Sequence, residues 1–128
     1  MDIFSIQKAF FQAINNKIYI NNKKINIFSC IPPKNTNMPF TLINLVKISQ
    51  DDGINSTAVV ELSIVDDSQS IKNISDIINQ IKSIISLDGI NENIDSSFIS
   101  CEIKSSQIEN DQKYGFSTGI LVYELIFQ

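Results

Sequence analysis

The 128-residue sequence contains no histidine, no arginine and no tryptophan, and it has only four glycines and two cysteines. Without histidine the chain lacks the usual general base, the commonest metal ligand and the Ser-His and Cys-His nucleophile pairs. Without arginine it lacks the usual phosphate clamp, and its scattered glycines form no phosphate-binding loop. We therefore expect the protein not to be an enzyme and to hold no cofactor and no metal.

The basic residues also limit the partners that we expect. All ten are lysines, and the formal net charge is −4. Nucleic-acid-binding domains usually carry a clustered basic face with arginine forks for phosphate and guanine. The one basic pair, Lys23-Lys24, falls in a predicted turn. The sequence thus argues against sequence-specific recognition of nucleic acid.

The two cysteines and the hydrophobic runs bear on the compartment. Cys30 and Cys101 follow no metal or redox spacing, so we expect partly buried free thiols, with a disulfide as the alternative. No apolar run reaches the roughly 20 residues of a membrane span, so no membrane partner is expected. The chain starts Met1-Asp2 and turns amphipathic, unlike a signal peptide. We expect the protein to be cytoplasmic when synthesised.

Three acidic groupings could carry chemistry. Asp51-Asp52-Gly53 begins like a calcium loop but lacks the closing glutamate, which favours a β-turn. Asp66-Asp67 precedes a predicted helix, where negative charge suits the helix dipole. Glu109, Asp111 and Lys113 fall in a predicted solvated loop. A paired-carboxylate hydrolase is the alternative, and it would need carboxylates that the fold brings together.

Two helices are predicted from apolar spacing. The first begins after a cap at Asp2 and ends at Asn15-Asn16, and its apolar positions are Ile3, Ile6, Phe10 and Ile14. Phe4 and Phe11 widen its stripe, which either the sheet or a neighbouring subunit must cover. The second covers 71–87, is capped by Ser68 or Ser70 and is stopped by Gly89.

The remaining pattern predicts strands. In chain order the pattern predicts a short hairpin (17–20 and 25–29), a proline-bracketed loop (34–38) and a long antiparallel hairpin with buried alternate positions (40–49 and 57–65). A final pair of strands follows (98–105 and 119–127), with a loop around 109–115. The last strand is apolar on both faces apart from Glu124, so we expect it inside the sheet or under a partner. The fold class predicted is α+β, a single two-layer domain over residues 1–128 with a mostly antiparallel sheet packed by two helices.

This layout resembles a known family. The segment Lys17-Ile18-Tyr19-Ile20 follows an amphipathic helix, and a proline-bearing loop opens the strand Met38-Pro39-Phe40-Thr41-Leu42. A strand ending Leu62-Ser63-Ile64-Val65 precedes the second helix, and the chain closes on Gly119-Ile120-Leu121-Val122-Tyr123-Glu124-Leu125. The order is similar to that of the small tail-completion, or tail-terminator, proteins of siphophage-like tails and gene transfer agents. The resemblance covers nearly the whole chain.

The resemblance implies a structural subunit. Copies of the chain would form a ring, a hexamer, on the head-proximal end of a tail tube. The ring would stop tube growth and dock the neck or head–tail connector protein. The tube protein and other copies of the chain would be its partners, and it would end as part of an assembled tail particle. The family carries no catalytic residues, and the lack of arginine and histidine here departs from what relatives often show.

We also predict which residues contact the tube or neck. They are the tip of the long hairpin and the loop before the last strand: Asp51, Asp52, Gly53, Asn55, Glu109, Asp111, Lys113 and Tyr114. Acidic side chains are expected to line the ring so that DNA slides through it. The alternative function is a monomeric protein-binding adaptor or chaperone domain.

Overall fold

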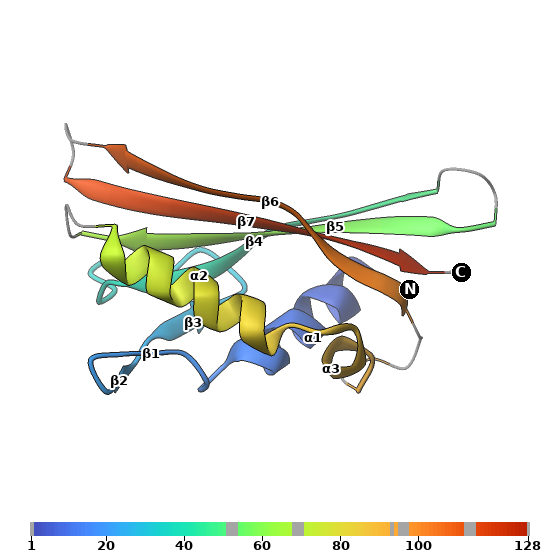
Figure 1. The fold of residues 1–128 in the computed structure, drawn as a ribbon, viewed down its shortest axis with the longest axis horizontal. Helices are drawn as coiled ribbons and strands as arrows, with labels where there is room; N and C mark the ends of the chain where they lie inside the picture. The colour runs from blue at the N-terminus through green and yellow to red at the C-terminus, as the bar shows by residue number, and fades with distance from the viewer. Residues whose placement is uncertain are drawn as a thin grey trace.

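The computed structural model describes residues 2–50, 54–67, 71–92, 94, 98–111 and 115–127. The helices lie against one face of a five-stranded sheet, so the molecule has two layers (Figure 1). The α+β, mostly antiparallel architecture predicted from the sequence is confirmed. In chain order the elements are α1 (Ile3–Ile14), β1 (Tyr19–Ile20), β2 (Lys23–Lys24), β3 (Asn26–Phe28), β4 (Phe40–Gln50), β5 (Ser56–Asp66), α2 (Lys72–Ile84), α3 (Leu87–Glu92), β6 (Phe98–Asp111) and β7 (Phe116–Phe127).

The five-stranded sheet has the order β3-β4-β5-β7-β6. Strands β4 and β5 form the predicted long antiparallel hairpin, paired from Phe40↔Val65 to Gln50↔Ser56 with a shift of register between Ile43 and Leu45. Strand β7 is antiparallel to both β5 and β6 and lies between them. Its apolar residues on both faces suit this interior place, as predicted.

The core lies between the sheet and the helices. The alternate residues of β5, from Ala58 to Ile64, are buried toward the helices, as the two-residue period predicts. Ile74, Ile77, Ile78 and Ile81 of α2 and Ile6, Phe10 and Ile14 of α1 cover them. The Phe10 ring meets the Tyr123 ring edge-on, with centroids 5.7 Å apart. The helical and strand periods therefore point at one common core.

The first helix forms as its sequence predicts. The Ser5 backbone N–H donates to Asp2 Oδ1 at 2.7 Å, which satisfies one of the free amides of the first turn. This hydrogen bond lowers the pKa of Asp2. The helix ends at Asn15, and Asn16 turns the chain with a φ of 65°, a conformation that asparagine tolerates.

The second predicted helix is divided, and the role predicted for Gly89 is wrong. Helix α2 ends at Ile84, and Gly89 lies inside the short helix α3. The Gly89 N–H donates to Ser86 Oγ at 3.0 Å, so Ser86 caps a new helix where the period alone predicted continuation. The predicted caps Ser68 and Ser70 lie outside the described residues, and the residue preceding α2, Ile71, makes no side-chain cap bond.

Two strand predictions are also corrected. Strand β1 pairs with β2, because Asn21 and Asn22 both adopt positive φ, 52° and 64°, and close a two-residue turn. Strand β3 does not pair with β1 as expected; it runs parallel to β4. Strand β6 continues to Asp111, where the sequence predicted a loop from residue 109.

Candidate functional site

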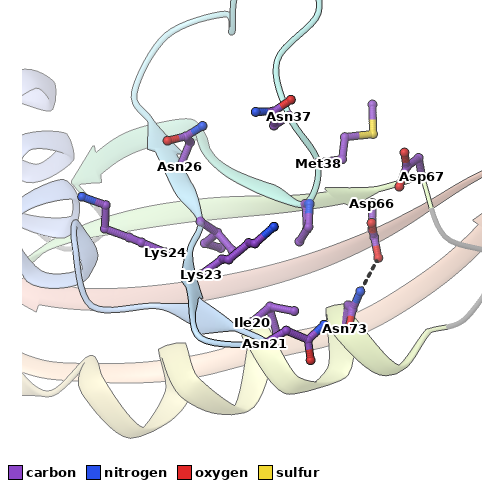
Figure 2. Close-up of a pocket in the computed structure, with 12 residues that line it drawn as sticks. Ile20, Asn21, Lys23, Lys24, Asn26, Asn37, Met38, Asp66, Asp67 and Asn73 are labelled. Carbon is purple, nitrogen blue, oxygen red and sulfur yellow. Dashed lines mark hydrogen bonds between the residues drawn. The ribbon is translucent and has the colours of Figure 1, made fainter.

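Carboxylates and lysines of this chain line the same cavity. It has a volume of about 730 Å³ and lies between the β1–β2 turn, the loop before β4 and the end of β5 (Figure 2). Lys23 and Lys24 form β2, Asp66 ends β5, and Asp67 follows it. The Asp66 side chain is buried and accepts a 3.2 Å hydrogen bond from Asn73 Nδ2 on α2.

The described residues that line this cavity are of six types, Ile, Asn, Lys, Met, Pro and Asp, and include no serine, cysteine or histidine. In the part of the chain that the structure describes, no three His, Cys, Asp or Glu residues gather as metal ligands. At this cavity the hydrogen bond from Asn73 to Asp66 joins α2 to the end of β5.

The predicted interface residues divide between described and undescribed segments. Asp51, Asp52, Gly53, Lys113 and Tyr114 lie outside the described residues. Asn55 is partly buried just before β5. Glu109 and Asp111 are exposed, but they sit in β6 rather than in a loop, because that strand pairs with β7 as far as Asp111↔Phe116. Their interface role stays a prediction.

The sheet face opposite the helices, here called the helix-free face, is a broad surface that the sequence did not single out. No described helix lies on it (Figure 1). It carries partly exposed aliphatic side chains beside charged ones. By strand alternation and register, the aliphatic ones include Leu42, Val59, Ile120, Val122 and Ile126. Antiparallel sheets commonly turn one such face to solvent while the other packs on the core.

Among the described residues of the helix-free face, acidic groups outnumber lysines. Glu124 pairs with Lys104 at 3.2 Å, and Asn44 Nδ2 donates to Glu61 Oε2 at 2.7 Å. Glu102 stands directly opposite Glu124 in the β6–β7 register. The acidic side chains on this face are Glu61, Glu102, Glu109, Asp111 and Glu124, and the lysines are Lys47 and Lys104.

The aromatic stripe of α1 is divided between the core and the surface. Phe10 is fully buried, whereas Phe4 is 69% exposed. Phe4 and Phe11 line a groove of about 290 Å³ that runs along α1 to Ser29. The sheet therefore covers only part of the stripe that the sequence expected a sheet or a subunit to cover.

The two thiols have different surroundings. Both cysteines are free, and Cys101 is half-buried in β6 as predicted, but Cys30 is exposed, so the partial burial predicted for it is wrong. Burial, and then the neighbouring Glu102 charge, raise the pKa of Cys101 to about 11. Burial also raises the pKa of Tyr123, with Cys101 adding to the effect. Protonated groups are favoured here because charge is poorly solvated beneath β6.

Comparisons with known proteins add one finding. No protein-family model matches the sequence, and no curated protein shows significant similarity to it. A chain from the virion of a native gene transfer agent (GTA) particle has a similar structure, with a TM-score of 0.72 and 11% sequence identity. The match covers 94% of this chain and 92% of that chain. This likeness establishes the fold.

The fold therefore belongs to a type found in an assembled particle. Across the described residues, no helix is long and apolar enough to cross a membrane. Sequence reasoning named Glu109 and Asp111 as contact residues but did not identify the helix-free face on which they lie. Alternation in β5 and β7 gave a partial signal, but which side the helices would cover depends on their packing.

Proposed function

We propose that this protein is a structural subunit of a phage-like tail. Copies form a ring, a hexamer, that caps the head-proximal end of the tail tube and joins the tail to the neck. The observation that supports this most is the likeness over nearly the whole chain to a chain of a gene transfer agent virion. The order of helices and strands, which resembles the tail-completion family, points the same way.

The surfaces of the chain suit a subunit. A ring needs two unlike patches on each copy, because neighbours meet head to tail. The α1 groove with its exposed Phe4 is one apolar patch available for such a contact. We further propose that the helix-free face borders the passage for DNA, where its surplus of carboxylates would keep phosphates from sticking.

Microscopy of particles tests this proposal. The protein carrying a small electron-dense label should appear at the head-proximal end of tails. Cells without the protein should make tails that vary in length and lack heads. Tails of normal length that still join heads in those cells would sink the proposal. A purified protein that stays monomeric at high concentration and is absent from particles would favour the adaptor alternative.

The hairpin tip is the proposed contact with the tube or neck. Removing residues 51–55 should leave the unfolding transition nearly unchanged, because β4 and β5 pair along 10 further rungs below the tip. Attachment of tails to heads should be lost. Normal particles assembled from this variant would contradict a contact role for the tip.

The proposed passage can be tested with DNA. Purified protein should bind a short duplex weakly at both about 50 mM and about 200 mM salt, since few phosphates would be neutralised. Reversal of Glu61 and Glu124 to lysine should create salt-sensitive binding. Tight binding by the unaltered protein that weakens steeply with salt would exclude an acidic passage.

A further inference from the structure

Both sides of the main sheet end in open strand edges. Strand β6 pairs with β7 on one side, and no described segment pairs with it on the other. Strand β3 pairs only with Phe40, Thr41 and Leu42 of β4, so β4 has a strand on one side alone from Ile43 to Ser49 among the described residues. We name these stretches, 100–109 of β6 and 43–49 of β4, the two open edges.

The chain closes the start of β6 and leaves the rest open. The Phe98 N–H donates to Asn91 Oδ1 at 2.7 Å, and Asn91 Nδ2 donates to the Phe98 carbonyl at 3.2 Å. The amide side chain of Asn91 thus takes the place of a neighbouring strand at this one residue. Beyond it runs most of a 14-residue edge strand, and such an edge is a template for another strand.

The strand directions allow the two open edges to join. Strands β4, β5, β7 and β6 alternate in direction, so β6 runs opposite to β4. A second copy in the same orientation would therefore bring its β4 antiparallel to β6. Each junction would continue the alternation of the sheet, with well-formed antiparallel pairing.

Charges at the two open edges are complementary. A single row of residues that stand opposite one another crosses β4, β5, β7 and β6; it consists of Lys47, Val59, Glu124 and Glu102 in that order. Their side chains share the helix-free face, so the row begins with an exposed lysine and ends with an exposed glutamate. Opposite charges directly across a strand pair stabilise it, and like charges destabilise it.

Among the described residues, no salt bridge compensates the charge of Glu102. It stands opposite Glu124, and Lys104 pairs with Glu124 at 3.2 Å. Among the described residues no lysine lies within 4 Å of Glu102. A lysine beside the open edge of β6 would relieve the repulsion between the two glutamates.

We propose that β6 of one copy adds to the open edge of β4 of the next copy, so that Glu102 faces Lys47 of its neighbour. The inference rests on the proposed ring, and it names the edges and the ion pair that join the copies. The same register brings Ile103, which is 43% exposed, beside Val46 of the neighbour on the helix side. Each copy uses both open edges, which suits a closed head-to-tail ring.

Cysteine cross-linking of the purified chain tests the junction. In a Cys30→Ser, Cys101→Ser background, one variant carries Glu102→Cys and another carries Lys47→Cys. When the two variants are mixed and oxidised, they should give a covalent dimer. A chain that carries both substitutions should give a series of covalent oligomers of increasing size. Neither single variant should cross-link to itself. A matched pair on the helical layer, Glu92→Cys with Lys82→Cys, should give none.

Two results would overturn the proposal. A dimer of Glu102→Cys alone would mean that two β6 strands pair about a two-fold axis. The mixture would be tested at concentrations where sedimentation shows assembly, or on particles that contain the protein. If it gives no cross-linked product there, the copies meet elsewhere. The cross-link reports the junction whether or not the ring sits on a tail, so microscopy of particles judges the proposed function separately.

Charge reversal provides a second measurement. Glu102→Lys and Lys47→Glu should each weaken self-association about tenfold at low salt, because like charges then face each other. The double reversal should restore association. High salt should reduce all these differences because exposed charges are screened. Single variants that both assemble as well as the unaltered chain, or a double variant that fails to recover, would contradict the pairing.

Discussion

Gly119 of β7 lies so close to Ile74 of α2 that a Cβ atom at residue 119 would come within 2.5 Å of Ile74 Cγ2. Ile78 Cδ1 would lie 3.1 Å from that added Cβ atom. The missing side chain therefore lets α2 pack onto the middle of the sheet. This contact joins the second helix to the last strand, which are distant in the sequence.

Gly119→Ala should lower the free energy of unfolding by about 1–3 kcal/mol, because the added methyl group overpacks a filled core. Urea denaturation measures the change. The control is Thr118→Ser, which changes the neighbouring residue on the helix-free face. It should change the free energy of unfolding by less than about 0.5 kcal/mol. In an Ile74→Ala background the cost of Gly119→Ala should shrink, and equal costs in both backgrounds would show that Ile74 is not the obstacle.

Two buried hydroxyls have no hydrogen-bond partner among the described residues, Thr41 Oγ1 and Tyr123 Oη. Thr41→Val and Tyr123→Phe should each raise the free energy of unfolding by about 1 kcal/mol, because the desolvation cost of an unpaired hydroxyl disappears. Tyr19→Phe is the matched control, since the Tyr19 hydroxyl is exposed and donates to the Asn16 carbonyl. Destabilisation by both core substitutions would indicate hidden partners.

The reactivity of Cys101 should depend strongly on folding. Its pKa rises from 9.0 to about 11, so at pH 8 the folded chain holds about a hundredfold less Cys101 thiolate than the unfolded chain. Alkylation followed by mass spectrometry should label Cys30 first and Cys101 mainly after denaturation. Equal labelling of the two thiols in the folded protein would contradict the burial of Cys101.

The same shift predicts sensitivity to alkali. Folding favours the protonated thiol of Cys101, so its contribution to stability is complete below pH 9 and is lost as the pH rises through about 11. Denaturation curves between pH 8 and pH 11 should show this loss, and Cys101→Ala should reduce the slope. Cys30→Ala, at an exposed thiol, should leave the slope unchanged.

The Gln80 side chain holds β1 against α2 through two hydrogen bonds. The Tyr19 N–H donates to Gln80 Oε1 at 3.0 Å, and Gln80 Nε2 donates to the Tyr19 carbonyl at 2.7 Å. Gln80→Glu cannot donate to that carbonyl, so it should cost about 1–2 kcal/mol of unfolding free energy near neutral pH. Asn79→Asp, one residue earlier and exposed, is the control; equal losses in both variants would point to a general effect of negative charge.

Much of the fold was predictable from local patterns. Asp2 and the spacing of Ile6, Phe10 and Ile14 define α1, and the alternation from Ala58 to Ile64 defines the buried face of β5. Both patterns are local because one segment repeats its contact with the core at a fixed period. The wrong prediction for the end of the second helix depended on competing local signals. Ser86 caps the new helix α3, so Gly89 lies inside that helix and does not end α2.

The candidate surfaces were less predictable. Glu109 and Asp111 looked like loop residues because polar side chains dominate there, yet pairing with β7 carries β6 past them. Pairing is a contact between segments, so the composition of one segment does not reveal its end. The groove beside Phe4 has the same origin, since the width of the helix stripe does not say how much of it the sheet will reach.

The sequence by itself determined that this is an α+β domain with a mostly antiparallel sheet, and its missing residue types argued against the usual catalytic groups. Periodicity and residue type carry that information because each segment expresses them alone. Only the tertiary structure decided that one sheet face stays free of described helices and that Lys47 and Glu102 end the same row at opposite edges. Strand order and register create that relationship, and both arise from packing between segments far apart in the chain.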